Sequence, residues 1–172
     1  TPLMPLDTYP FSEHYGWIQD RYGLSWQIMY VEQAPEQKIK PALLFSNGVC
    51  GLAKEALEFY TKTFKNSAIT YVSEYKKGEA TSPAAKINYA EFKLNNLELV
   101  AMDHGECDDF TFNEAFSMMI LCKDQKEIDY YWQKLSVVPE AESCGWLKDK
   151  YGFSWQVVPE RYYEMMDKGT EE

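Results

Sequence analysis

The chain has 172 residues, of which 45% are hydrophobic and 16% aromatic, so it can bury a core of ordinary size. Its formal net charge of −10 argues against a general nucleic-acid surface, which needs clustered lysine and arginine to displace counterions. No run approaches the roughly 18 apolar residues of a membrane span, and the N-terminus lacks the basic and apolar regions of a signal peptide. We therefore expect a globular cytoplasmic protein with neither a nucleic-acid nor a membrane partner.

The four cysteines are widely spaced and form no Cys-x-x-Cys pair. They are Cys50, Cys107, Cys122 and Cys144. Metal clusters and disulfide frameworks usually show closer and more regular spacing. We expect four reduced thiols, most of them buried as small hydrophobic side chains.

Residues 1–37 are expected to form an N-terminal extension. Three prolines before Phe11 predict extended chain, residues 11–30 predict a β-hairpin, and residues 31–37 read as a polar linker. The apolar face and strand edges of this hairpin need cover, because exposed edges pair with other chains. We expect that cover to come from a partner's sheet, which predicts a homodimer.

A complete domain is predicted over residues 38–159. Hydrophobic periodicity gives the order strand, helix, strand, strand, strand, and this order then recurs after an acidic loop. The first set spans 39–45, 52–64, 68–75, 87–94 and 97–102. The second set has a strand at 115–122, a helix at 124–135 capped by Asp124, a weak strand at 137–143 and a closing hairpin. Residues 160–172 are expected to form a helix and an acidic tail.

A 14-residue sequence repeat occurs at 16–29 and at 145–158, and eight of its positions are identical in the two copies. Each copy predicts a β-hairpin whose turn contains a glycine. Asp20 and Asp149, which precede these glycines, are interpreted as turn formers. Trp155 and Val157 share one face of their strand, and a large aromatic such as Trp155 is most often part of the core.

Several stretches resemble the vicinal-oxygen-chelate superfamily, which includes glyoxalase I, and within it the PhnB-like group that is often labelled 3-demethylubiquinone methyltransferase-like. They are Lys40–Phe45, Ala56–Tyr60, Leu99–Asp103, Phe112–Ser117, Asp129–Trp132, Cys144–Asp149 and Trp155–Gln156. The resemblance covers residues 38–159 in order, and residues 11–30 look like the end of a preceding domain of the same type. It implies an α+β fold in which tandem βαβββ modules form a cupped mixed sheet.

Superfamily enzymes bind a divalent metal through His and Glu side chains that line the cup. By this resemblance the ligand positions fall near Lys40, at Ser117 and at Gln156. A protonated lysine does not ligate, serine is a poor neutral ligand, and an amide brings no charge to offset a dication. We therefore expect no metal in the usual place and no cofactor.

The methyltransferase label can be tested against the predicted element order. A methyl-donor site of the usual kind follows the first strand of a parallel α/β sheet and lies beside a helix N-terminus. Here the glycines of residues 47–51 are followed by hairpin strands instead of alternating βαβ units. The sequence therefore does not predict methyl transfer.

Three functional hypotheses remain. The first is a protein that binds a small organic molecule in an aromatic cup without a metal. Its expected ligand-binding residues are Phe45, Met102, Ser117, Met119, Trp146, Trp155 and Gln156. The second is a metal-dependent or metal-independent enzyme of lyase, isomerase or dioxygenase type, with His104 and Asp103 as catalytic residues. The third is an assembly-only domain, and for His104 and Asp103 the alternative is an exposed polar loop.

Overall fold

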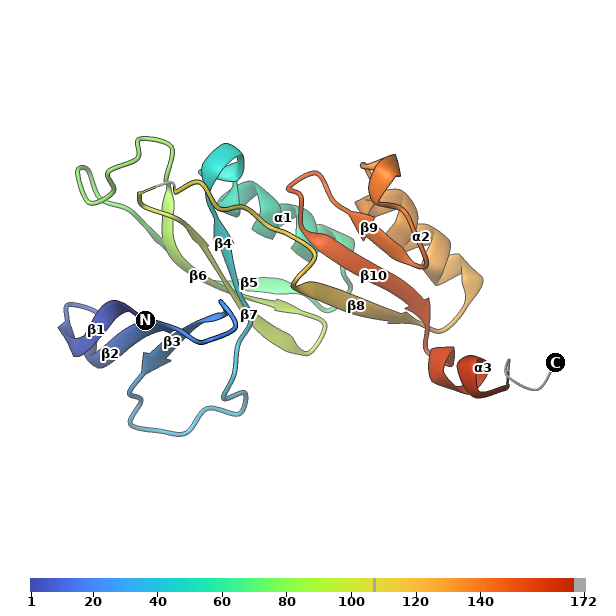
Figure 1. Cartoon of the computed structure of the whole chain (residues 1–172), viewed down its shortest axis with the longest axis horizontal. Helices are drawn as coiled ribbons and strands as arrows, with labels where there is room; N and C mark the ends of the chain where they lie inside the picture. The colour runs from blue at the N-terminus through green and yellow to red at the C-terminus, as the bar shows by residue number, and fades with distance from the viewer. Residues whose placement is uncertain (107, 169–172) are drawn as a thin grey trace. The chain divides into compact units, whose positions relative to one another are not determined.

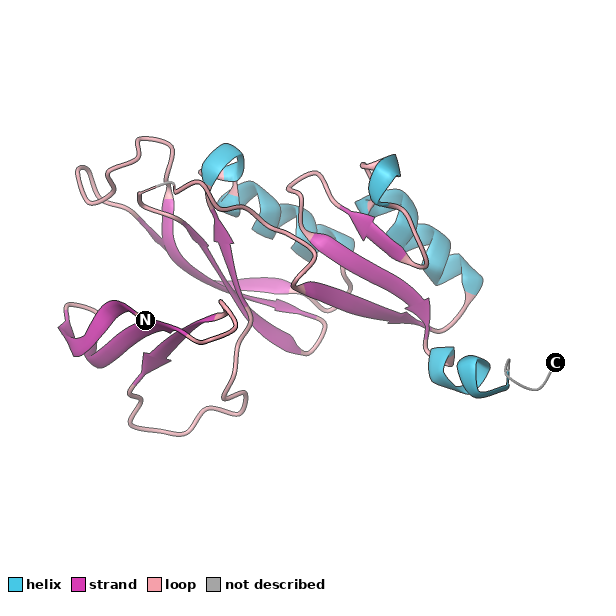
Figure 2. Ribbon diagram, in the orientation of Figure 1, coloured by secondary structure: helices cyan, strands magenta, loops and turns pink. Residues whose placement is uncertain are grey.

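The computed structural model describes residues 1–106 and 108–168, and the chain divides into two compact units (Figure 1). The first unit is Thr1–Ile39 and the second is Lys40–Glu172. The second unit contains both helices and strands, whereas the regular elements of the first unit are strands (Figure 2). The predicted α+β class is confirmed.

The first unit is a three-stranded antiparallel sheet of order β1-β2-β3. Its strands are β1 (Pro2–Tyr9), β2 (Ser12–Gln19) and β3 (Ser25–Met29). Strands β2 and β3 form the predicted hairpin, and its turn includes Gly23 at a φ of 88°, which glycine adopts without strain. The segment expected only to be extended pairs with β2 as strand β1, so one edge of the hairpin is covered within the unit.

The second unit begins with one βαβββ module. Its elements are β4 (Ala42–Phe45), the 3₁₀ helix η1 (Asn47–Val49), α1 (Ala53–Thr63), β5 (Ala68–Glu74), β6 (Ile87–Leu94) and β7 (Leu97–Asp103). The sheet has the order β4-β7-β6-β5, with β4 parallel to β7 and the other pairs antiparallel. Helix α1 buries Ala56, Leu57 and Tyr60 along one stripe, as the 3.6-residue period predicts.

The second module repeats this plan with one strand fewer. Its elements are β8 (Ser117–Cys122), α2 (Gln125–Leu135), the 3₁₀ helix η2 (Pro139–Ala141), β9 (Trp146–Lys148) and β10 (Ser154–Pro159), followed by α3 (Tyr162–Lys168). Asp124 caps α2 by accepting a hydrogen bond from the Glu127 amide at 2.9 Å, as predicted. The sheet has the order β8-β10-β9, with β8 and β10 parallel.

The prediction of a strand at residues 137–143 is wrong. This segment forms η2, and Ser143 makes only an isolated bridge to Trp146. Pro139 explains the difference, because proline has no backbone N–H to donate to a strand ladder and its fixed φ suits the first turn of a helix.

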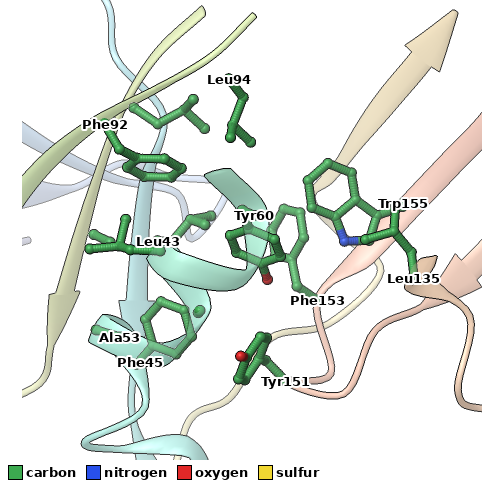
Figure 3. Close-up of a cluster of buried hydrophobic side chains, with 14 of the residues drawn as sticks. Leu43, Phe45, Ala53, Tyr60, Phe92, Leu94, Leu135, Tyr151, Phe153 and Trp155 are labelled. Atoms are coloured by element: carbon green, nitrogen blue, oxygen red, sulfur yellow. The ribbon is translucent and has the colours of Figure 1, made fainter. Parts of the chain in front are cut away.

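One hydrophobic core joins the two modules of the second unit (Figure 3). Strands β4, β6 and β7 contribute the side chains of Leu43, Phe45, Phe92 and Leu99 to this core. The closing hairpin contributes those of Leu147, Tyr151, Phe153, Trp155 and Val157. Figure 3 shows Tyr60 of α1 beside Phe153 and Trp155 of the second module. Helix α1 therefore serves the cores of both modules.

The cysteine prediction is wrong for one thiol. Cys50 is disulfide-bonded, whereas Cys122 and Cys144 are free and Cys107 lies outside the described residues. Cys122 is buried, and this burial raises the pKa of its thiol to about 11. Within the described residues, no helix is long and apolar enough to cross a membrane.

Candidate functional site

The closing strand β10 alternates side chains that point into the core with side chains on the opposite side of the sheet, where Gln156 is partly exposed and Ser154 and Val158 are buried. Trp155 and Val157 point into the core, and Ser154 and Gln156 therefore lie on the opposite side of the sheet. Strands β8 and β9 continue this side with alternate residues that stand in register. We call this side the open face, and define it by Ser117, Met119, Trp146, Lys148, Ser154 and Gln156.

Gln156 lies at the centre of the open face. Its side-chain amide donates a hydrogen bond to Ser117 Oγ at 2.8 Å. In the ladder Gln156 is flanked by Met119 of β8 and Trp146 of β9. The structure thus brings together four of the residues that the sequence assigned to ligand binding, from three different strands.

A shallow pocket of about 220 Å³ opens beside these residues. It is lined by Glu114, Ala141, Trp146, Leu147, Lys148 and Ser154. Ser154 is buried, and its hydroxyl has no hydrogen-bond partner among the described residues. A buried hydroxyl without a partner is unfavourable, so a ligand atom that bonds to it would gain free energy.

An ion pair lies at the wall of this pocket, between Lys148 Nζ and Glu114 Oε1. The hydrogen bond from Lys148 lowers the pKa of the Glu114 carboxyl below its ordinary value. Lys148 and Ser154 were missed as site residues, although the alternation of Trp146 with Lys148, and of Ser154 with Gln156, places all four on one face.

Met102 belongs to the other sheet of the unit, where β7 alternates Leu99 and Ala101 in the core with Glu98 and Met102 on the other side. Lys40 forms ion pairs there with Glu91 at 3.4 Å and Glu98 at 3.0 Å. Burial lowers the pKa of the Lys40 ammonium, but hydrogen bonds and charge from Glu98 and Glu91 outweigh this and leave it raised. Lys40 is therefore a fixed positive charge.

The side chains at the expected metal-ligand positions do not fit a divalent metal. Lys40 presents an ammonium that is already paired with two carboxylates, and Gln156 uses its amide to donate to Ser117. Among residues 1–106 and 108–168, no group of three or more His, Cys, Asp or Glu side chains is arranged to hold a metal ion. A cation near Lys40 would meet a positive charge, and at Ser117 and Gln156 it would meet only neutral oxygens.

Besides Met102, two residues that the sequence assigned to the ligand cup do not lie on the open face. Phe45 is fully buried, and its ring packs edge-on against Phe112 at 5.1 Å. Trp155 is 1% exposed and packs between Tyr60 and Phe64. Both strands turn these aromatic rings toward the helices, because the helix-covered side of each sheet is the side that excludes water.

The two candidate catalytic residues are placed differently from one another. The Asp103 carboxylate is 1% exposed and accepts hydrogen bonds from four backbone amides at 2.8–3.2 Å, which belong to Gly51, Ala53, Lys86 and Ile87. This carboxylate holds the start of α1 to the start of β6. His104 turns toward the following loop, where its Nδ1 lies 3.9 Å from Asp108 Oδ2 and its ring packs on Phe110.

A second buried carboxylate lies in the closing hairpin. Asp149 accepts hydrogen bonds from the amides of Tyr151 and Phe153, as expected of a turn former, and also from Trp155 Nε1 at 2.8 Å and Tyr60 Oη at 2.7 Å. Burial raises the pKa of Asp149, although these four hydrogen bonds oppose the shift. The contact with Tyr60 joins residues far apart in sequence, and no local pattern predicts it.

Tandem modules of this kind, with a helix packed behind each sheet, define a glyoxalase-like fold of the vicinal-oxygen-chelate superfamily. The sequence profile of a family described as 3-demethylubiquinone-9 3-methyltransferase matches residues 5–29 and 37–158. The chain belongs to this PhnB-like family, and the resemblance noted in the sequence is confirmed.

Solved structures agree with this assignment. A PhnB protein from Bacillus cereus is 33% identical, with a TM-score of 0.59, and the alignment covers 71% of this chain and 99% of that one. Protein PA1353 from Pseudomonas aeruginosa shares the fold at 16% identity and a TM-score of 0.53, with 70% and 96% of the two chains covered. A search of curated proteins found no match.

Proposed function

We propose that this protein binds a small organic molecule on the open face, without the metal usual in the superfamily. The observation that carries the proposal is the buried Ser154 hydroxyl, which lies in a pocket beside Trp146 and has no hydrogen-bond partner within residues 1–106 and 108–168. The indole offers an apolar wall and the hydroxyl a polar anchor. Gln156 and Ser117 add an amide and a hydroxyl that fix orientation, which is the usual composition of a small-molecule site.

Native mass spectrometry of the purified chain tests this directly. We expect a copurified organic molecule that is released on denaturation, and we expect Ser154→Ala and Gln156→Ala to lower its occupancy. Gln133→Ala, which changes an exposed residue on α2, is the matched control and should leave occupancy unchanged. Equal occupancy in all four proteins would contradict the assignment of the ligand to the open face.

The absence of a metal requirement is tested separately by elemental analysis. We expect no stoichiometric divalent metal in the unmutated chain, because Gln156 and Lys40 offer no anionic ligand at the expected positions. Gln156→Glu restores a carboxylate and should increase the bound metal. Stoichiometric metal in the unmutated chain, measured beside a mock purification, would refute the metal-free proposal.

We further propose that the chain forms a homodimer. Strand β8 places Met119 and Leu121 in solvent, 42% and 54% exposed, next to the candidate pocket. Covering them with a second copy would remove this apolar surface from water. Light scattering should give twice the mass of the chain, and Leu121→Asp should shift it toward the monomer. A monomer at all concentrations would exclude the dimer.

A further inference from the structure

The two copies of the 14-residue sequence repeat, at 16–29 and 145–158, each fold into a hairpin, and the two hairpins have the same register. In the first copy the paired residues are Trp17 with Gln27, Ile18 with Trp26, and Gln19 with Ser25. In the second copy the equivalent pairs are Trp146 with Gln156, Leu147 with Trp155, and Lys148 with Ser154. The two hairpins can therefore be compared position by position.

An aspartate holds the turn and the indole of each hairpin in the same way. Asp20 Oδ1 accepts from the amides of Tyr22 and Leu24 at 2.8 and 3.0 Å, and its Oδ2 accepts from Trp26 Nε1 at 3.0 Å. Asp149 accepts the corresponding three hydrogen bonds from the amides of Tyr151 and Phe153 and from Trp155 Nε1, at 2.9, 3.1 and 2.8 Å. The first hairpin thus has the internal geometry of the second.

The two hairpins differ in what covers them. In the second copy the face that carries the indole is buried, with exposures of 1% for Leu147, 2% for Tyr151, 1% for Phe153, 1% for Trp155 and 3% for Val157. In the first copy the equivalent exposures are 39% for Ile18, 78% for Tyr22, 51% for Leu24, 39% for Trp26 and 55% for Ile28. We call this exposed surface of the first copy the hairpin face.

In the second copy, the side chains of Tyr60 and Phe64 cover the face that is exposed in the first copy. Helix α1 places the Tyr60 ring 5.5 Å from the ring of Trp155, and Phe64, which follows this helix, places its ring at 5.3 Å. The Tyr60 hydroxyl also donates the fourth hydrogen bond to Asp149. Asp20 accepts no hydrogen bond from a tyrosine hydroxyl in the described part of the first unit, and its carboxylate is exposed.

The family profile provides independent support, because it matches residues 5–29 as a separate stretch from residues 37–158. The first unit is thus a piece of the same fold, present in addition to the two modules of the second unit. The exposed apolar face of such a piece favours contact with the part of the fold that covers it in the complete domain.

We infer that the hairpin face binds the strand–helix part of another domain of this family, whose helix supplies a tyrosine hydroxyl to Asp20. A second copy of the 172 residues is the poorer occupant. In that copy the Tyr60 and Phe64 side chains already pack on its own Trp155, and Tyr131 of α2 stacks on Phe64. The occupant is therefore a strand–helix segment of this family whose helix is not covered by a hairpin of its own and carries a tyrosine and, four residues later, an aromatic side chain.

A synthetic peptide with the sequence of residues 52–65 serves as the probe, because it contains Tyr60 and Phe64 at this spacing. It is titrated into the full chain, and the indole N–H signals are followed by nuclear magnetic resonance. We expect a saturable shift of the Trp26 signal and no shift of the Trp155 signal, since Trp155 is already covered.

Two matched changes test the predicted hydroxyl contact. A peptide with Tyr60→Phe should bind about tenfold more weakly, because it cannot donate to the carboxylate. Asp20→Asn in the chain should weaken binding of the unmodified peptide similarly. Asp7→Asn changes a carboxylate of the same unit that accepts from the Thr8 amide and should have no effect.

Three results would overturn the inference. The first is a Trp26 signal that does not shift at millimolar peptide, which would mean that the hairpin face does not take such a helix. The second is equal affinity for the two peptides, which would remove Asp20 from the contact. The third is a Trp26 shift that depends on chain concentration without peptide, which would make a second copy the occupant.

Discussion

The hydrogen bond from Tyr60 to Asp149 should be a large single contribution to the stability of the second unit. Tyr60→Phe removes only the hydroxyl, and it leaves the ring in its packed position between the modules. The four donors that converge on Asp149 favour its ionised form, and hydrogen bonds to charged groups contribute about 1.5–3 kcal/mol. We expect a loss of about 2 kcal/mol in the free energy of unfolding at pH 7.

Urea unfolding measures this loss against a chemically identical control. Tyr130→Phe removes a hydroxyl that donates to the neutral carbonyl oxygen of Thr63 at 2.9 Å, and it should cost about 1 kcal/mol. With a denaturant dependence of about 2 kcal/mol per molar urea, the midpoint of Tyr60→Phe should fall by about 1 M and that of the control by about half as much.

The pH dependence provides a second check. Burial raises the folded-state pKa of Asp149, so the folded chain binds this proton more tightly than the unfolded chain, and stability from this group is lost as pH rises through its folded pKa. Tyr60→Phe removes a donor to the ionised form and should raise that pKa further. The loss should therefore be smaller at pH 4 than at pH 7. Equal losses at both pH values, or a loss no larger than that of Tyr130→Phe, would refute the charged hydrogen bond.

Three further predictions, on four substitutions, test other contacts by the same urea measurement. Asp103→Ala should cost about 3 kcal/mol, because it leaves four backbone amides without their acceptor, and a loss below about 1 kcal/mol would show that water replaces the carboxylate. Asp149→Asn should destabilise the chain far more than Asp20→Asn, because only Asp149 is buried, and similar losses would contradict this difference in cover. Lys40→Met should cost about 1 kcal/mol and less at high salt, because it removes the cation between two carboxylates, and a salt-independent loss would argue against an ion-pair origin.

The order of elements could be predicted from the sequence because each is encoded locally. The alternation over 87–94 predicts β6 with its observed bounds, and Asp124 marks the start of α2. The strand expected at 137–143 fails for a local reason that the sequence contains, since Pro139 cannot take part in a strand ladder.

The candidate site was less predictable, because alternation separates two faces of a strand without saying which one a helix covers. Phe45 and Trp155 were assigned to the same surface as Met119 and Gln156, and the structure places them on the covered side. The partner of Asp149 was also out of reach, because Tyr60 comes from a different module and only the folded core brings the two together.

The hydrogen bond between Tyr60 and Asp149 also constrains when the second unit can finish folding during synthesis. The two residues are 89 positions apart, so α1 leaves the ribosome long before the carboxylate that its hydroxyl will meet. Until the closing hairpin emerges, the apolar side of α1 that it covers remains open to water or to other chains. Contacts of such long range slow folding and lengthen the interval in which a nascent chain depends on chaperones. Completion of the core is therefore coupled to translation of the closing hairpin, whose Asp149 follows Tyr60 by 89 positions.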